Sequence, residues 1–365
     1  MTDTTVRVAV PGGIGYEVLV GRGLLRELGP LVSKAVPGAS AAALVADARI
    51  EPTHGATAEA SLAAAGLRVE RIPVPSGESS KSFEGYRNLL DRLVAARLER
   101  TSPVVAVGGG VVGDLAGFAA ATYLRGVPLV MAPTTLLAMV DSSVGGKTGI
   151  DHPLGKNLIG AFHAPALVVA DVETLASLDP AEIAAGAAEV VKYGVIRDAA
   201  LFESLERAGL PRDAEATAAL VARCVAVKGG VVERDEREGG LRRILNFGHT
   251  VGHAIESVTG YSRFRHGEAV SIGMVVAARI AEAKGVAVEP VARRLESLLG
   301  RLGLPTRVPG DLADGAILEA LSRDKKARSG RVHFVLPRRI GDVVVSADVA
   351  PDEIRSAIAA ARAGT

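Results

Sequence analysis

The chain has 365 residues, 48% of them hydrophobic, and a formal net charge of +1 at pH 7. This length exceeds what one hydrophobic core usually holds, so two domains are expected. The near balance of charge creates no long-range field that would favour nucleic acid or acidic lipid, so a bound anion must be held by local clusters of Lys and Arg. The single cysteine, Cys224, excludes an internal disulfide and suits a reducing compartment.

The amino-terminal residues lack the apolar run that is typical of a signal peptide. Asp3 and Arg7 precede any apolar run, so no signal peptide is expected. The most apolar stretch, residues 127–140, contains Pro128 and Pro133 and is shorter than the roughly 20 residues that a membrane span requires. We therefore expect a cytoplasmic protein.

Residues 1–178 alternate short apolar runs with helix-like segments. The runs at 41–45, 103–107, 129–132 and 167–170 each predict a buried strand that ends in Gly, Asp or Pro. Strands that alternate with helices in this way indicate a largely parallel sheet. We predict an α/β, Rossmann-like N-terminal domain.

Helix-start signals mark the end of this domain. Asp179, Pro180 and Glu182 occupy positions typical of an N-cap and a first helical turn. Helical periodicity then dominates, as at 290–302 and 351–361, and strand-like runs return only at 332–336 and 342–345. We predict one domain over 1–178 and a mainly α-helical domain over 179–365, with a ligand cleft between the two.

A glycine-rich turn follows the predicted strand at 103–107. Gly108, Gly110 and Gly113 satisfy the G-x-G-x-x-G pattern, which lets backbone amides approach a pyrophosphate. The usual acidic residue about 20 positions later is missing, and the motif lies far from the amino terminus. A simple tight turn between strand and helix is therefore the alternative.

Other predicted strand ends carry polar groups too. Residues 76–82 contain Glu78 and Lys81, Thr134 and Thr135 follow the strand at 129–132, and residues 141–149 form a second glycine-rich loop with Lys147. Open α/β sheets bind ligands at this edge. The second loop is not a Walker A motif, because Asp141 stands where the first glycine belongs, so we do not expect a nucleoside triphosphatase.

Candidate metal ligands gather in the second domain. His249 and His253 are four residues apart, so both imidazoles project from one face if the segment is helical, and His266 and Glu189 complete the group. Zinc enzymes commonly use three such ligands and leave a position open for substrate. Glu189, His249 and His266 supply that set.

The role of His253 stays open at this point. As a fourth ligand it would close the site, and as a free side chain it would be a titratable base beside a cation. A lone histidine is more often a satisfied polar group, but three histidines with a carboxylate in an apolar helix favour a metal. Thr250 occupies the position where metalloproteases of the H-E-x-x-H type carry Glu, which argues against a protease.

Basic residues near these motifs form a candidate anion-binding set, consisting of Lys147, Lys156, Lys192, Lys228, Arg242 and the pair Lys325 and Lys326. We interpret Arg234, Arg237 and Arg243 as part of a solvated face. Lys156 and Asn157 lie in a predicted turn with little helical character, where a binding role is more plausible.

These motifs together resemble the 3-dehydroquinate synthase family over nearly the whole chain. The resemblance lies in GGGVVGDLAGF at 108–118, PTTLLAMVDSSVGGKTGI at 133–150, HPLGKNLIGAF at 152–162, AEVVKYG at 188–194, LNFGHTVGHAIE at 245–256, HGEAV at 266–270 and DKK at 324–326. It implies a homodimeric phosphate lyase that binds NAD and one divalent metal, zinc or cobalt, in each subunit. Its reaction converts 3-deoxy-D-arabino-heptulosonate 7-phosphate to 3-dehydroquinate and phosphate in the shikimate pathway to chorismate and the aromatic amino acids.

The family reaction comprises transient oxidation by NAD, phosphate β-elimination, reduction, ring opening and an intramolecular aldol closure. Oxidation acidifies the neighbouring proton and so makes elimination feasible, while the metal polarises the substrate oxygen. The final closure needs a site that holds one conformer.

The resemblance also implies roles for individual residues. The metal ligands would be Glu189, His249 and His266, and His253 would assist proton transfer. Substrate contacts would come from Asp141, Lys147, Asn157, Lys192, Lys228, Arg242, Asn246 and one of Lys325 and Lys326, with Arg125 reaching across the dimer; Lys228 and Arg242 would hold the substrate carboxylate. NAD would contact Ser76, Gly77, Glu78, Ser79, Ser80, Lys81, Gly110, Val111, Val112, Gly113, Asp114, Thr134, Thr135, Lys147, Lys156, Thr174, Leu175, Ala176 and Ser177. Asp47 departs from the family pattern because Ala48 follows it, which puts its ribose contact in doubt.

Three alternatives remain at the level of sequence. The first is another sugar phosphate cyclase, such as an amino-dehydroquinate synthase or an enzyme that uses sedoheptulose 7-phosphate. The second is a metal-dependent, NAD-linked alcohol dehydrogenase, which would not need so many lysines. The third is a catalytically silent binding protein, against which the complete set of candidate ligands argues.

Overall fold

The computed structural model describes residues 3–9, 15–327 and 332–363, and their side chains except those of 323–327 and 363. Contacts divide the chain into two compact units. The first unit comprises Met1–Leu178 and Arg212–Glu233, and the second comprises Asp179–Pro211 and Arg234–Thr365.

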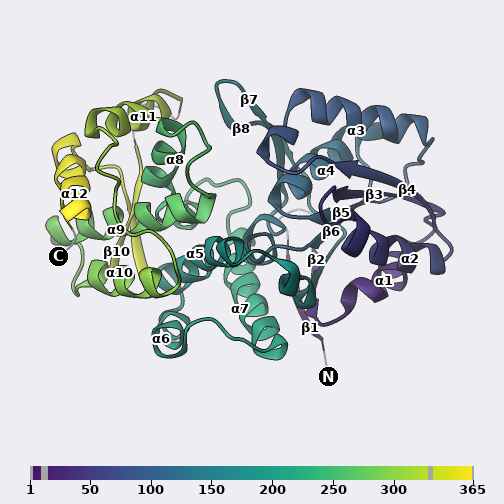
Figure 1. Cartoon of the computed structure of the whole chain (residues 1–365), viewed down its shortest axis with the longest axis horizontal. Coiled ribbons are helices and arrows are strands. Elements are labelled where there is room, and N and C mark those ends of the chain that lie inside the picture. The colour runs from purple at the N-terminus through teal and green to yellow at the C-terminus, as the bar shows by residue number, and fades with distance from the viewer. Residues whose placement is uncertain (1–2, 10–14, 328–331, 364–365) are drawn as a thin grey trace. The chain divides into compact units, whose positions relative to one another are not determined.

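A seven-stranded sheet forms the centre of the first unit (Figure 1). Its strands are β1 (Thr4–Val8), β2 (Tyr16–Gly21), β3 (Ala41–Asp47), β4 (Arg68–Val74), β5 (Val104–Gly108), β6 (Leu129–Pro133) and β9 (Leu167–Asp171), in the spatial order β1-β2-β9-β6-β5-β3-β4. All neighbouring pairs are parallel except β1 with β2. The predicted α/β fold and its four buried strands are confirmed, and β4 is the strand expected before residue 76, whereas β1 and β2 were not predicted.

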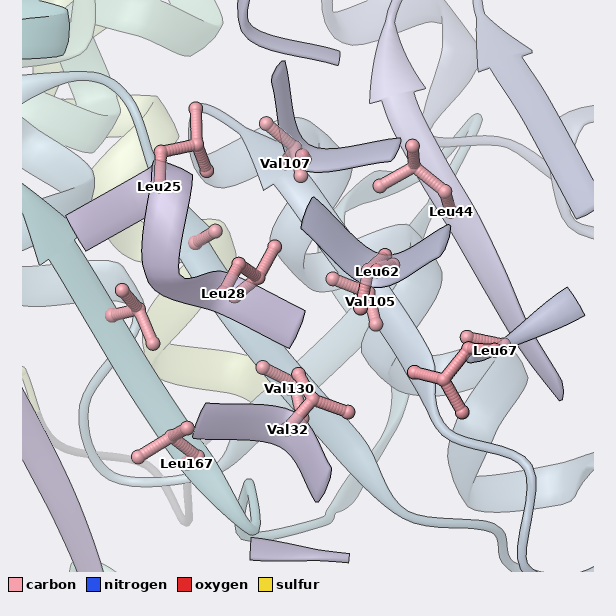
Figure 2. Close-up of a cluster of buried hydrophobic side chains, with 14 of the residues drawn as sticks. Leu25, Leu28, Val32, Leu44, Leu62, Leu67, Val105, Val107, Val130 and Leu167 are labelled. Atoms are coloured by element: carbon pink, nitrogen blue, oxygen red, sulfur yellow. The ribbon is translucent and has the colours of Figure 1, made fainter. Parts of the chain in front are cut away.

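Alternate residues of the central strands contribute to a hydrophobic core cluster of this unit. Leu44 of β3, Val105 and Val107 of β5, Val130 of β6 and Leu167 of β9 point to one face, because successive side chains of a strand alternate between faces. Figure 2 shows these side chains packed against leucines and a valine of α1 (Leu28–Ala35), α2 (Ala56–Ala64) and the short helix η1 (Leu24–Glu27). Strands buried on both faces read as continuous apolar runs, which is why they were recognisable in the sequence.

The remaining helices of this unit surround the sheet. Helix α4 (Gly110–Thr122) packs on β5, β6 and β3, and α7 (Ala214–Val232) packs on β1 and β2. The other elements are η2 (Glu51–Gly55), η3 (Glu78–Ser80), α3 (Phe83–Ala95), η4 (Tyr123–Arg125), η5 (Ala138–Ser142), η6 (Val172–Ser177) and the antiparallel pair β7 (Lys147–His152) and β8 (Gly155–Phe162).

Helix α7 explains a difference from the expected domain limits. The unit boundary after Leu178 lies where the sequence analysis placed the domain boundary, but residues 212–233 belong to the first unit and not to the second. Residues 212–233 belong to the first unit because α7 approaches β1 closely. A Cβ at Gly229 of α7 would lie 3.2 Å from a methyl carbon of Val8 in β1. A helical pattern reveals an amphipathic helix but not the sheet that it covers.

The second unit is mainly helical, as predicted. It contains α5 (Pro180–Ile196), α6 (Ala199–Ala208), η7 (Leu241–Asn246), α8 (His249–Val258), α9 (His266–Ala283), α10 (Val291–Arg301), α11 (Asp314–Ala327), α12 (Pro351–Ala363) and the antiparallel strands β10 (Phe334–Arg339) and β11 (Asp342–Ser346). Helix α9 is buried almost all round and packs against α5, α8, α10 and α12, so it is the central helix of the unit. Helix α5 begins as predicted, with the Asp179 carboxylate accepting a hydrogen bond from the Ala181 amide at 2.7 Å.

Two glycines of α9 allow its neighbours to approach closely. A Cβ at Gly267 would lie 2.0 Å from the backbone oxygen of Ala185 in α5, and a Cβ at Gly273 would lie 1.9 Å from the backbone oxygen of Gly248, which precedes α8. Both positions therefore exclude any larger residue without movement of the backbone. These contacts bring α5, α8 and α9 together at the end that carries the predicted metal ligands.

Membrane-spanning helices are absent from the described residues. No helix there combines the length and the apolar character that crossing a bilayer requires.

Replacement of Gly267 by Ala is expected to destabilise the fold. The new methyl group meets the backbone of α5, so the free energy of unfolding should fall by about 1–3 kcal/mol or more, the usual cost of overpacking. Gly300→Ala is the matched control, because Gly300 lies in α10 with nothing within 4 Å of the position that a Cβ would take, and the higher helix propensity of Ala should be neutral or favourable there. Urea unfolding of both variants measures the difference, and equal stabilities would contradict the close contact.

Candidate active site

Three helices of the second unit bring four candidate metal-binding side chains together. Glu189 comes from α5, His249 and His253 come from α8, and His266 is the first residue of α9. The Oε1 atom of Glu189 lies 3.6 Å from Nε2 of His249 and 3.8 Å from Nε2 of His266. Ligand atoms bound tetrahedrally to zinc at about 2.0–2.1 Å stand about 3.4 Å apart, so these distances suit a shared ion.

The other nitrogen of each of these two imidazoles lies beside an acceptor. His249 Nδ1 is 3.1 Å from the backbone oxygen of Phe247, and His266 Nδ1 is 3.5 Å from Oε2 of Glu256. Because carbonyl and carboxylate oxygens only accept, the proton of each neutral ring belongs on Nδ1. The lone pairs on Nε2 then face Glu189, as metal ligation requires.

The environment of Glu189 tests whether a cation fits. Its side chain is fully buried, and the ammonium group of Lys192, one turn further along α5, forms an ion pair with Oε2. Despite this ion pair, neither carboxylate oxygen has a hydrogen bond of ordinary geometry from the described residues. A buried carboxylate in that state is costly, and a divalent cation held with imidazole nitrogens offsets the cost. Carboxylate and imidazole donors fit zinc or a similar ion.

His253 lies in the same group but in a different environment. Ligand atoms of His249, His253 and His266 all lie within 4.8 Å of one another, so the three histidines alone are also a possible metal-binding set. His253 is exposed, whereas His249 is only 9% exposed. The geometry therefore permits both sets, and the buried carboxylate of Glu189 favours the set that includes it.

The pKa of His249 lies well below the usual value for histidine. Burial is the largest cause, the positive charge of Lys192 acts in the same direction, and protonation of His266 or His253 would add to it. The imidazole is therefore neutral near pH 7, which is the form that binds a metal.

Two buried cations accompany this group in the second unit. Lys192 is 1% exposed and Arg242 is 2% exposed, and Arg242 lies in η7 just before α8. Its guanidinium donates through Nη1 to the backbone oxygen of Glu236. Nearby, Nδ2 of Asn246 donates to Oε1 of Glu238 at 2.6 Å. Buried cations of this kind are suited to an anionic ligand.

The loop before η7 is organised by one carboxylate. Asp235 accepts hydrogen bonds from the backbone amides of Gly239, Gly240 and Arg242 at 2.7–2.8 Å. Burial would raise the pKa of Asp235, but these hydrogen bonds and the charge of Arg242 outweigh it, so the pKa is lowered. Asp235 thus holds the backbone of Arg242 in place, a role that the sequence analysis missed.

The first unit collects the predicted nucleotide-binding residues along the carboxyl edge of its sheet. Residues 76–81 follow β4, Gly110–Asp114 follow β5, Thr134 and Thr135 follow β6, and Thr174–Ser177 follow β9. Parallel strands end at the same edge, which is where open α/β sheets bind ligands. Helix α4 also begins there at Gly110, so its N-terminus offers backbone amides and a favourable dipole to a phosphate.

Lys81 is the centre of an ionic cluster at this edge. Its ammonium nitrogen lies 2.7 Å from Asp114 Oδ2, 3.7 Å from Glu78 Oε1 and 3.9 Å from Asp151 Oδ1, and Lys156 lies 3.5 Å from the same Glu78 oxygen. Burial lowers the pKa of Lys81, but Asp114 and Glu78 outweigh this effect, so the net shift is upward. Burial raises the pKa of Asp114, and Lys81 opposes that rise. The cluster offers both signs of charge to a polar ligand.

Two further residues of this edge were not predicted. Asp151 joins the cluster from β7, and Nε2 of His54 lies 2.8 Å from the hydroxyl of Ser177 in η6. Neither residue belongs to a local motif, so only the folded chain reveals the contact. Asp47, whose role the sequence left in doubt, is hydrogen-bonded to the hydroxyl of Ser76 across the ends of β3 and β4.

The predicted substrate contacts of the first unit have varied environments. Lys228 of α7 donates to the backbone oxygen of Asp141 at 2.7 Å and pairs with its carboxylate in the irregular helix η5. Lys147 and Asn157 are exposed on β7 and β8, where Asn157 has φ of +54° and its backbone N–H donates to the carboxylate of Asp151. Arg125 is exposed in η4. Lys325 and Lys326 have described backbones in α11, but their side chains lie outside the described part of the chain.

Comparison with known proteins decides the family. Models of the 3-dehydroquinate synthase N-terminal and C-terminal domains match residues 71–185 and 186–327, more than half of the chain. A 3-dehydroquinate synthase of Symbiobacterium thermophilum is 53% identical over 351 residues, which cover 95% of this chain and 98% of that protein. The chain belongs to the 3-dehydroquinate synthase family. This confirms the resemblance seen in the sequence and the expectation of an enzyme of that type.

Solved structures extend the relationship to other cyclases. A 2-epi-5-epi-valiolone synthase from Streptomyces hygroscopicus, with NAD+ and Zn2+ bound, has a TM-score of 0.86 and 31% identity, and covers 97% of this chain and 98% of its own. A 2-deoxy-scyllo-inosose synthase, complexed with carbaglucose-6-phosphate, NAD+ and Co2+, has a TM-score of 0.85 and 26% identity, and covers 97% and 99%. Both similarities span nearly the whole of each chain.

Replacement of Asp235 by Asn should destabilise the protein in a manner that depends on pH. The folded-state pKa of Asp235 is lowered, so its contribution to stability is present above the usual aspartate pKa of about 3.9 and is lost as the pH falls through the folded-state value. The stability gap between wild type and Asp235→Asn is therefore expected at pH 7 and should narrow below about pH 4. Thermal unfolding across this range measures it.

Asp91→Asn is the control for this experiment. The Asp91 side chain is 69% exposed and forms a long surface ion pair of 3.7 Å with Arg87, so its replacement should change stability little at any pH. If the difference in stability between the wild type and Asp235→Asn does not change with pH, the backbone hydrogen bonds to the Asp235 carboxylate are contradicted.

Proposed function

We propose that this protein converts 3-deoxy-D-arabino-heptulosonate 7-phosphate to 3-dehydroquinate and phosphate, with NAD and one divalent metal ion as cofactors. The observation that carries the proposal is the meeting of Glu189, His249 and His266 at 3.6–3.8 Å, in a chain that is 53% identical to a 3-dehydroquinate synthase. The NAD+ and the Zn2+ or Co2+ of the two solved cyclases support the choice of cofactors. When bound, NAD would accept and return a hydride, and the metal would polarise a substrate oxygen.

The metal is assigned to Glu189 and the Nε2 atoms of His249 and His266. The lowered pKa of His249 keeps that ring ready to bind, and the carboxylate partly neutralises the ion. His253 is assigned to proton transfer, because it lies one turn from His249 yet is exposed, so it can exchange a proton with substrate or solvent.

NAD is assigned to the carboxyl edge of the sheet in the first unit. The N-terminus of α4 at Gly110 suits the pyrophosphate. Glu78, Lys81 and Asp114 supply carboxylate and ammonium groups of the kind that bind ribose hydroxyls. The remaining NAD contacts are assigned to Thr134, Thr135, Lys156 and residues Thr174–Ser177.

The substrate is an acid and a phosphate ester, and the basic residues suit both groups. We assign its carboxylate to Arg242, whose planar guanidinium can form two parallel hydrogen bonds with a carboxylate. We assign the remaining hydroxyl, ketone and phosphate oxygens of the substrate to Lys192, Lys228, Asn246, Asp141, Lys147, Asn157 and one of Lys325 and Lys326. A site that holds several of these oxygens limits the conformers open to the substrate before ring closure.

We also propose that the protein is a cytoplasmic homodimer. The buried free thiol of Cys224 suits a reducing compartment. Leu124 and Arg125 have φ values of +50° and +68°, which strain a backbone of non-glycine residues, and such strain is commonly retained for function. An exposed Arg125 held in this turn suits a role at a subunit interface.

Another branch of the cyclases is the alternative activity. Identity to the 2-epi-5-epi-valiolone synthase is 31%, against 53% to the 3-dehydroquinate synthase of Symbiobacterium thermophilum. This difference favours the dehydroquinate branch.

Variants of the metal-binding group separate ligands from the proposed base. His249→Ala is expected to lose the metal and the activity together. His253→Ala should keep the metal while turnover falls about 10²-fold to 10⁴-fold, the usual contribution of general acid–base catalysis. Metal content and turnover, measured on both proteins after reloading with zinc, test this division. Metal loss from His253→Ala equal to that from His249→Ala would identify His253 as a ligand.

The activity itself is tested with the purified protein, NAD, zinc and 3-deoxy-D-arabino-heptulosonate 7-phosphate. We expect 3-dehydroquinate and one phosphate per substrate, without steady accumulation of the reduced nicotinamide absorbance, because the hydride returns to the same molecule. Sedoheptulose 7-phosphate is the control substrate. It lacks the carboxylate and should be turned over very poorly, since the two charge-assisted hydrogen bonds assigned to the Arg242 guanidinium cannot form.

Two outcomes would contradict the proposal in different ways. Stoichiometric NADH would indicate a dehydrogenase. Comparable turnover of the two sugar phosphates would place the chain in another cyclase branch.

A further inference from the structure

Helix α8 carries a buried carboxylate that the proposed function does not use. Glu256 is 2% exposed, and it follows His249 by seven residues and His253 by three. Residues seven apart lie two turns along the same face of a helix, so Glu256 and the two histidines share one face. A carboxylate in that position is costly unless a partner compensates it.

His266 is a partner that the geometry supplies. Its Nδ1 atom lies 3.5 Å from Glu256 Oε2, while Nε2 of the same ring lies 3.8 Å from Glu189 Oε1. The imidazole thus stands between two carboxylates and presents one nitrogen to each. Because the Glu256 carboxylate only accepts hydrogen bonds, the ring proton belongs on Nδ1, and the Nε2 lone pair is left for a ligand.

His249 has a weaker version of the same support. Its Nδ1 lies near a neutral backbone oxygen of Phe247, whereas that of His266 lies near an anion. A carboxylate behind a ligating histidine orients the ring and makes its free nitrogen a better donor to a metal. The His266 side chain is 33% exposed, against 11% for His249. Packing therefore restrains the His266 ring less, and a carboxylate partner has a larger effect on its orientation.

We infer that Glu256 is a positioning residue, which fixes the tautomer and the orientation of His266 and so sets the affinity of the Glu189, His249 and His266 group for a divalent metal. The inference rests on the proposed metal site. It requires no contact of Glu256 with the substrate or with the ion itself.

The test measures metal binding without any substrate. Glu256→Gln keeps the size of the side chain but removes its charge, and Glu256→Ala removes the acceptor altogether. Titration with Co2+ alone, in competition with a chelator, should show affinity about 10-fold lower for Glu256→Gln and up to about 100-fold lower for Glu256→Ala, the range usual for such partners. The visible absorption of bound Co2+ should change as well, because it reports the ligand geometry.

Glu182→Gln is the matched control. Glu182 forms an ion pair with Arg265, the residue before His266, and both side chains are more than 40% exposed. Its replacement removes a carboxylate at the start of α5, beside the residue that precedes α9, and leaves the contacts of the His266 ring unchanged, so Co2+ affinity should remain as in the wild type.

The outcomes separate this inference from the metal site on which it rests. Native Co2+ affinity in Glu256→Gln, together with loss of binding in Glu189→Gln, would overturn the role of Glu256 and leave the site intact. Native affinity in both Glu189→Gln and His249→Ala would overturn the site and the inference together.

A second measurement applies if the Glu256 variants do not fold. Nitrogen-15 chemical shifts of His266 in the metal-free wild type report which ring nitrogen carries the proton. Protonation at Nδ1 is expected, and a neutral ring protonated at Nε2 would contradict the inference.

Discussion

The second unit is organised around a carboxylate buried in an apolar helix. Twelve consecutive residues of α5, from Ala185 to Ile196, are buried, and Glu189 lies among them. The ammonium group of Lys192 offsets part of the cost of this charge, and Nε2 of His249 and of His266 face the same carboxylate, so three helices must meet at one point. The absence of a side chain at Gly267 allows that meeting, since α9 approaches the backbone of α5 at this residue. Packing and site chemistry therefore depend on the same few contacts.

A different constraint governs the first unit. Its sheet has parallel central strands, so the loops that follow β4, β5, β6 and β9 emerge at one edge. The segments that follow β4, β5 and β6 are far apart in sequence, yet Lys81, Asp114 and Asp151 of these segments form one ionic cluster. The central strands offer few polar side chains for this purpose, because they are buried on both faces. The chemistry is accordingly confined to the ends of the strands.

Several features of both units could be predicted because they have local signals. The four central strands are continuous apolar runs, the start of α5 has an Asp cap followed by Pro180, and His249 and His253 are spaced by one helical turn. Glu189 stood out for the same kind of reason, as a charge within an apolar helical pattern. The family resemblance added the assignment of these residues to a metal and to NAD.

The sequence by itself therefore determined the α/β class, the helical character of the second unit, the glycine-rich turns and the residue types of the metal-binding group. Only the tertiary structure decided that residues 212–233 pack with the first unit, that Asp235 holds the backbone of Arg242, and that Glu256 lies behind His266. Local patterns follow from the period of a helix or strand, which a sequence displays directly. Contacts between distant segments depend on which surfaces pack together, and no periodicity within a segment specifies its partner.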